Sequence, residues 1–185
     1  MTSYTTNPEQ KIEVYKIAVL MNEAGLSSAF ISDAVEVARE YEGAFELMKL
    51  WVEEKSQRER DEIIADLQDE IDRLKEAPQQ PFRAPRINFD ELDRNAEQVL
   101  KFKLELRQLV DRWGGIAQLA RETGMPQPSL SRFFKSASFP RNTTIYRIVH
   151  ALMPKDATSS LNWSAPYSIE QITALIWNKQ NGANN

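Results

Sequence analysis

Apolar residues recur every three or four positions along most of this chain, a pattern that predicts amphipathic helices. An N-x-x-Q motif at residues 7–10, with proline in its second place, is typical of a helix start. We expect this first helix to stop at Gly25, because glycine readily adopts the backbone conformation that ends a helix. A second helix should be capped by Ser27 or Ser28 and reach about Tyr41.

A third helix is predicted to start near Gly43 and to continue unbroken into a highly charged stretch. Within that stretch, apolar residues at alternating spacings of three and four form an a/d seam. The seam residues are Ile64, Leu67, Ile71 and Leu74. A seam of about two heptads is marginal by itself. We therefore predict that it pairs across a homodimer or binds a partner, the alternative being an antiparallel bundle within one chain.

The chain is expected to divide into an acidic helical region, 1–76, a proline-rich linker, 77–88, a second domain, 89–180, and a short tail, 181–185. The linker favours extended, semi-rigid conformations because its prolines fix the backbone. The second domain should open with a long helix that ends before the glycine pair Gly114-Gly115. Its expected apolar positions are Leu100, Leu104, Leu106, Leu109 and Val110.

The run from Ile116 to Lys135 predicts two short helices joined by a tight turn. Ala120 is small, as a close helix crossing requires, and Gly124 supplies the left-handed conformation that ends the first helix. Leu130 and Phe133, at helical spacing, are expected to point into the core. This order of small, glycine and apolar positions is typical of a helix-turn-helix.

A further amphipathic helix follows at 142–153, and with it residues 93–153 resemble the DNA-binding domain of the lambda repressor and Cro-like family. The resemblance implies an all-α, five-helix domain whose second motif helix enters the major groove of DNA. A last helix is predicted to begin near Ser168. In this family a helix in that place often packs against its twin, which gives a second possible dimer contact.

The second helix of the motif carries the side chains that we expect to meet DNA. Gln127 can pair with adenine through its amide, and Arg132 can pair with O6 and N7 of guanine. Pro128, where the family often has a polar reader, is expected to touch only a thymine methyl. The same face carries Ser131. Phosphate contacts are expected from Ser129, Lys135, Arg141 and Asn142. The alternative is that all of these are ordinary solvated side chains.

Charge is distributed unevenly along the chain. The whole sequence has 23 basic and 27 acidic residues, net −4. Residues 1–76 hold 9 basic and 18 acidic side chains, net −9, whereas residues 77–185 hold 14 and 9, net +5. A basic domain in an acidic protein is the charge pattern expected of a DNA reader. We expect the acidic part to contact a protein.

The composition offers little for catalysis. The chain has no cysteine and one histidine, His150, and it contains no Walker, dinucleotide or nucleophile-elbow motif. The many carboxylates between residues 53 and 69 include no Glu-x-x-His pair, so we interpret them as a solvated face. We expect no enzyme activity, no cofactor and no metal. The sequence shows neither a secretory signal nor a membrane-spanning run, so a cytoplasmic location is expected.

These observations predict a sequence-specific, DNA-binding transcriptional regulator, a dimeric repressor that reads paired half-sites of double-stranded DNA. The alternative is an antitoxin or adaptor whose N-terminal helices bind a protein partner, with DNA binding serving autoregulation. A third interpretation is a helix-turn-helix that contacts only proteins, which the basic charge disfavours.

Overall fold

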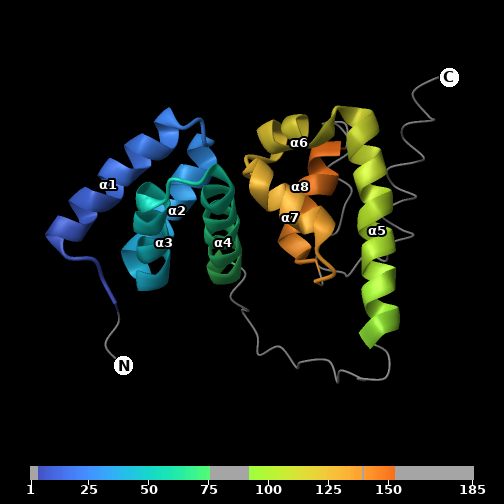
Figure 1. Ribbon diagram of the computed structural model, residues 1–185, viewed down its shortest axis with the longest axis horizontal. Helices are drawn as coiled ribbons and strands as arrows, with labels where there is room; N and C mark the ends of the chain where they lie inside the picture. Colours follow the sequence, from blue (N-terminus) through green and yellow to red (C-terminus); the bar gives the residue numbers. More distant parts are fainter. Residues whose placement is uncertain (1–3, 76–91, 139, 153–185) are drawn as a thin grey trace. The chain divides into compact units, whose positions relative to one another are not determined.

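The computed structural model describes residues 4–75, 92–138 and 140–152, and every regular element in these ranges is a helix (Figure 1). The all-α prediction is confirmed for this part of the chain. Contacts between Cα atoms divide the protein into two compact units. The first comprises Met1–Arg83 and Gly124–Arg132, and the second comprises Ala84–Thr123 and Phe133–Asn185. The predicted linker at 77–88 lies outside the described residues.

The first unit opens with α1 (Pro8–Glu23) and α2 (Ser28–Glu40), both of which start at the predicted caps. Asn7 Oδ1 accepts a hydrogen bond from the Gln10 backbone N at 2.9 Å, and Gln10 Oε1 accepts one from the Asn7 backbone N at 2.9 Å. This reciprocal pair is a capping box, which satisfies two otherwise unpaired donors of the helix start. Ser27 caps α2, its Oγ accepting from the Phe30 backbone N at 3.2 Å.

The predicted continuous third helix is wrong, because the chain forms two helices, α3 (Glu42–Glu53) and α4 (Gln57–Lys75). The Glu54 carboxylate accepts hydrogen bonds from the backbone N atoms of Lys55 and Ser56, both at 2.8 Å. Ser56 Oγ in turn accepts from the Glu59 backbone N at 3.4 Å. These side chains bind backbone donors of the interhelical turn and the start of α4, so they favour a new helix start over continuation.

The four helices α1 to α4 share one core, in which α1 contacts α2 and α3, and α4 contacts α2 and α3. Ile64, Leu67 and Ile71 of the predicted seam are at most 2 % exposed and belong to this core, whereas Leu74 is 39 % exposed. The seam therefore packs within the chain, as in the alternative that the sequence left open. Its three buried residues cannot form a dimer surface while this core is intact.

The second unit contains α5 (Leu92–Trp113), α6 (Gly115–Thr123) and α8 (Asn142–Leu152), with α6 in contact with both α5 and α8. The glycine break is confirmed, since Gly114 and Gly115 have φ of 142° and 80°. The remaining helix, α7 (Gln127–Lys135), is shared, because residues 127–132 belong to the first unit and 133–135 to the second.

The five apolar positions named for this helix do not all lie on its buried face. Leu100 and Leu104 are 41 % and 59 % exposed. The buried side chains include instead Phe102 and, at 1 % exposed, Lys103. Leu106, Leu109 and Val110 are also buried. Four of the five helices expected in the second domain lie in the described residues, and the last, near Ser168, lies outside them.

Candidate nucleic-acid interface

The predicted order of helix, glycine turn and helix is confirmed between residues 115 and 135. Gly124 has φ of +73°, the left-handed conformation that a residue with a side chain adopts only with strain. The chain then enters α7 at Gln127, and the Leu130 backbone N donates to the Pro126 carbonyl at 3.2 Å in the first turn. Pro128 lies in this first turn, where its missing N–H removes no helical hydrogen bond.

The apolar anchors of the motif are mostly buried, and the burial predicted for Leu130 is confirmed. Leu119 and Leu130 are fully buried, and Met125 is 4 % exposed. Phe133 is only half-buried, and its ring meets that of Phe134 edge to face at 5.0 Å between centroids. The helix thus has an inward side at Leu130 that limits which of its other side chains can reach a ligand.

The side chains expected to meet DNA differ in their exposure. Gln127 and Lys135 are exposed, and Pro128 and Ser131 are half-buried. Ser129 is only 8 % exposed, and its Oγ has no hydrogen-bond partner in the described part of the chain. The phosphate contact expected of Ser129 is therefore not available in this structure, because the hydroxyl is covered.

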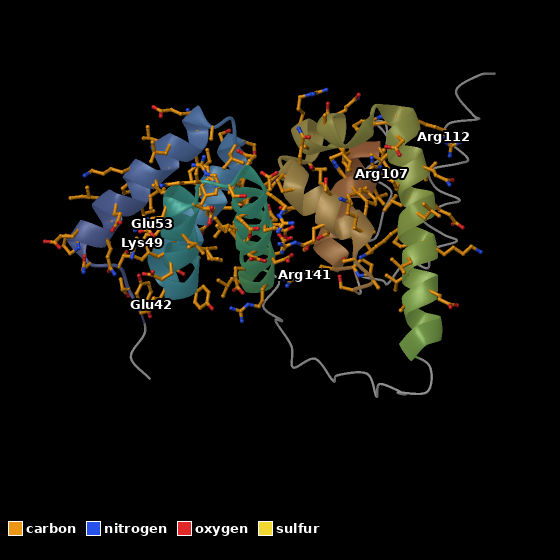
Figure 2. The ribbon with its side chains drawn as sticks, viewed as in Figure 1. Glu42, Lys49, Glu53, Arg107, Arg112 and Arg141 are labelled. Atoms are coloured by element: carbon orange, nitrogen blue, oxygen red, sulfur yellow. The ribbon has the colours of Figure 1, made fainter. Side chains whose placement is uncertain are left out.

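Two further residues expected to contact phosphate lie at the start of α8. Arg141 directly precedes the helix and is half-buried (Figure 2). The backbone N of Ile145 donates to the Arg141 carbonyl at 3.1 Å, so Arg141 is in the position of a helix cap. Asn142 is the first residue of α8, and the structure describes its backbone but not its side chain.

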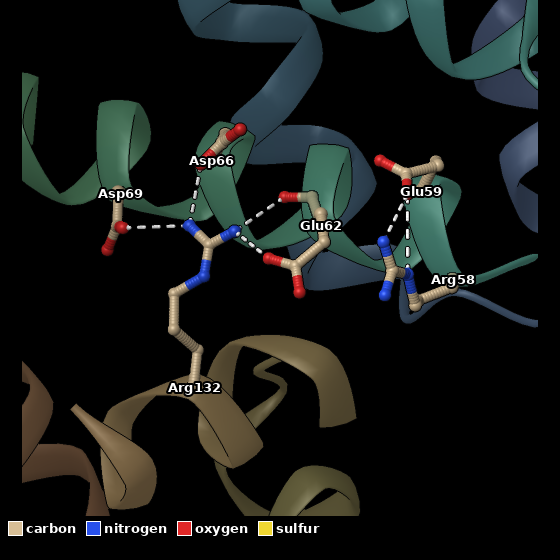
Figure 3. Close-up of polar contacts among 6 residues, drawn as sticks. All are labelled: Arg58, Glu59, Glu62, Asp66, Asp69 and Arg132. Carbon is tan, nitrogen blue, oxygen red and sulfur yellow. Dashed lines mark hydrogen bonds and ion pairs between the residues drawn. The ribbon is translucent and has the colours of Figure 1, made fainter.

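Arg132 is bound by carboxylates of α4, within the first unit (Figure 3). Its Nη1 lies 2.6 Å from Asp66 Oδ1 and 3.5 Å from Asp69 Oδ2. Its Nη2 donates to Glu62 Oε2 at 2.6 Å and to the Glu62 carbonyl at 3.0 Å. We call Glu62, Asp66 and Asp69 the acidic ladder. The predicted guanine reader thus has its donors occupied by anions of its own chain.

The electrostatics of Arg132 combine two opposing effects. Partial desolvation lowers the pKa of the guanidinium, but hydrogen bonds and charges of Asp66 and Glu62 outweigh it and raise the pKa above its ordinary value. Arg132 is 30 % exposed, whereas the ladder side chains are 53–60 % exposed. The contact is therefore an ion cluster at the edge of solvent.

The sequence did contain a signal for the acidic ladder. Its residues are spaced i, i+4 and i+7, which aligns them on one face of a helix. These carboxylates are largely exposed, as a solvated face requires, but they also bind a cation. The spacing identifies the face, but the cation lies more than 60 residues away in sequence, and only the fold shows which one it is.

The turn before α7 is also held within the first unit. Ser27 Oγ donates to the Gly124 carbonyl at 2.5 Å while it caps α2. A Cβ added to Gly124 would lie 3.2 Å from Ala29 Cβ, closer than most side-chain contacts. Gly124 therefore serves two purposes, a left-handed turn and close packing on the start of α2.

In the second unit, the buried Lys103 holds the loop that follows α7. Its Nζ donates to the carbonyls of Ser136 and Ser138, both at 2.8 Å, and to Ser136 Oγ at 3.2 Å. It also lies 4.7 Å from the centroid of the Phe133 ring, a cation–π contact. Burial lowers the pKa of this ammonium. Three acceptors use all three of its donors, which is how a buried charge is tolerated.

Several other ion pairs of the described residues join neighbours on one helix. On α3, Lys49 pairs with Glu46 at 3.3 Å, and on α5, Arg107 pairs with Asp111 at 2.8 Å. Within the described ranges, no group of His, Asp or Glu side chains has the arrangement of a metal site. No described helix combines the length and the apolar character needed to span a bilayer.

Comparison of the chain with family models, curated proteins and solved structures gave no match. The resemblance to the lambda repressor and Cro-like family therefore depends on the residues of the motif alone.

Proposed function

We propose that the protein is a sequence-specific DNA-binding regulator whose α7 is the reading helix. The observation that carries this proposal is the arrangement of α7, a short helix that follows a left-handed glycine turn. It buries Leu130 while its side chains Gln127, Arg132 and Lys135 extend from the core. Amide and guanidinium groups are those that recognise adenine and guanine in the major groove.

The direction of Arg132 is compatible with the same proposal, although carboxylates of α4 occupy its donors in this structure. Its guanidinium leaves α7 and forms short, charge-assisted bonds with anions at 2.6 Å. A guanidinium fork that fits carboxylates also fits phosphate oxygens and the paired acceptors of guanine. Its direction from α7 is thus compatible with an anionic or acceptor-rich surface.

We also propose that two copies act together on paired half-sites, as in a repressor dimer. Ile64, Leu67 and Ile71 are buried in one chain, and the other contact that the sequence offers for a dimer, the helix predicted near Ser168, lies outside the described residues. No contact within the described residues favours an antitoxin or adaptor function, so this function stays the alternative.

The test is selection of duplexes from a random-sequence library by the full chain, followed by binding measurements with two variants. Arg132→Ala should weaken binding to the enriched duplex by about 1–3 kcal/mol and relax the preference at one base pair. Lys135→Ala should weaken binding to all duplexes alike. It should also lower the slope of the logarithm of the binding constant against the logarithm of the salt concentration by about one.

Two results would contradict the proposal. The first is the absence of any enriched sequence, which would remove sequence-specific binding altogether. The second is an equal loss on enriched and scrambled duplexes for Arg132→Ala, which would show that Arg132 contacts only the backbone.

A further inference from the structure

The acidic ladder of α4 has the chemistry of a DNA surface. Glu62, Asp66 and Asp69 present carboxylates along one helix face, and all three contact one guanidinium (Figure 3). Carboxylate and phosphate oxygens accept the same forked hydrogen bonds from arginine. The Glu62 carbonyl accepts a further bond at 3.0 Å, so the guanidinium is bound on two sides.

We infer that the acidic ladder is an internal substitute for DNA, which binds Arg132 in the DNA-free protein and has to release it when α7 engages a duplex. This inference rests on the proposed function. According to this inference, the acidic ladder of α4 is a binding surface for Arg132 of the same chain, and DNA competes with the ladder for that arginine.

The exposure of the cluster makes the contact reversible. Arg132 keeps 30 % of its side-chain surface in water, and each ladder carboxylate keeps more than half. Ion pairs at such positions contribute little to folding and are screened by salt. A contact of this kind can be exchanged for another anion without unfolding the helices that carry it.

The ladder also acts on DNA through its negative charge, in addition to binding Arg132. Three carboxylates contact Arg132, so the single charge of its guanidinium does not by itself balance the charge of the ladder. Like charge at this surface raises the free energy of an approaching phosphate backbone. Bound Arg132 and residual charge therefore act in the same direction, against DNA at α7.

A second contact, at the Gly124 carbonyl, binds the turn before α7 to the first unit. At the start of the same segment, Ser27 Oγ of the α2 cap donates to the Gly124 carbonyl at 2.5 Å. Segment Gly124–Arg132 is thus held at both ends, by α2 and by α4, which is consistent with its place in the first unit. This docking involves the turn and the reading helix together.

The experiment uses the full chain and a ladder variant, Glu62→Gln/Asp66→Asn/Asp69→Asn, which keeps side-chain shape and removes three charges. The matched control, Glu13→Gln/Glu23→Gln/Glu40→Gln, removes the same charge from exposed positions of α1 and α2. Affinity is measured on a labelled random-sequence duplex pool and on the enriched duplex. The ladder variant should bind at least about fivefold more tightly than the control, the lower end of typical coupling between sites.

In the Arg132→Ala background, the ladder substitutions should give a smaller gain over Arg132→Ala alone, because only the repulsion is then removed. A gain equal to that of the control, or one that is as large in the Arg132→Ala background as in the wild type, would overturn the inference, because it would come from charge alone. The contact between Arg132 and Asp66 can also be tested without DNA, by thermal unfolding of Arg132→Ala, Asp66→Asn and the double variant. Non-additive melting temperatures support the contact, and additive ones overturn it.

The two proposals fail in different ways. If neither the wild type nor any charge-removed variant binds a duplex, the proposed function fails, and the inference fails with it. If the wild type binds and selects a sequence but the ladder variant gains no more than its control, only the inference fails.

Discussion

Two consecutive segments of the chain, Gly124–Arg132 and Phe133–Ser138, are held by different kinds of contact. In the first, Arg132 meets charged carboxylates at the edge of solvent. In the second, Lys103 is 1 % exposed and meets two carbonyls, a hydroxyl and an aromatic ring. Both contacts satisfy a cation, but only the first does so with groups of opposite charge.

The difference suggests which contact can be exchanged. An ion pair in water has a small net free energy, because hydration competes with it. A buried ammonium has no such competitor, and removing its acceptors leaves an uncompensated charge. We therefore expect the Arg132 contact to be replaceable by another anion, and the Lys103 contact to be a permanent part of the fold.

The largest expected effect follows from Lys103→Met. Methionine has similar length but no donor, so the carbonyls of Ser136 and Ser138 lose their partner. The free energy of unfolding should fall by about 3 kcal/mol. Denaturant titration measures it, with Lys101→Met, an exposed position on α5, as the control that should change by less than about 0.5 kcal/mol. Equal effects of the two variants would mean that Lys103 is not a fixed structural contact.

The next effect concerns the turn that precedes α7. Gly124→Ala should destabilise the protein by about 1–2 kcal/mol, because alanine is strained at φ of +73°. Gly25→Ala, at φ of +82° with nothing within 4 Å of the added Cβ, reports the strain alone. Thermal unfolding should show a larger loss at Gly124, because its Cβ also approaches Ala29. Identical losses would contradict the close packing of the turn on α2.

Arg132→Ala should have a much smaller effect on folding, at most about 1 kcal/mol. The loss should shrink as salt is added, because ions screen the cluster. Denaturant titration at low and high salt measures both quantities, and Lys135→Ala provides the comparison at an exposed position of the same helix. A loss as large as that of Lys103→Met, unchanged by salt, would show that the two contacts do not differ in kind.

The smallest effect is a dependence on pH. Burial lowers the pKa of Lys103 below 10.5, so the unfolded chain binds its proton more tightly than the folded protein does. Between the lowered pKa and 10.5, the contribution of this group to stability rises with pH. The stability difference between wild type and Lys103→Met should therefore widen as alkaline pH approaches 10.5. A difference that narrows over this window would contradict the direction of the shift.

Local signals were enough to predict the helix starts. The α1 capping box and the Gly124 turn depend on residues a few positions apart, so the sequence alone identifies them. The break between α3 and α4 was also accessible, since Ser56 and Glu59 have capping-box spacing. The apolar pattern on both sides nevertheless favours one continuous helix, because it does not change at the break.

Contacts over long sequence distances were not predictable from pattern. A lysine within a helix is expected at the surface, so nothing marks Lys103 as buried until its acceptors, 33 and 35 residues away, are known. Residue type alone marks the candidate readers in the sequence, and their DNA contacts stay predictions. That Arg132 meets three carboxylates of α4 depends on packing between segments more than 60 residues apart.

The most direct test of the account follows the Nε–Hε resonance of Arg132 by NMR while the enriched duplex is added. In the DNA-free state, the resonance of the wild type should differ from that of the ladder variant, because only the wild type has the charged carboxylates. At saturation with the duplex, the two proteins should share one new position. An Arg132 resonance that stays at its DNA-free position while the duplex binds would contradict the account, because the arginine would then remain on α4.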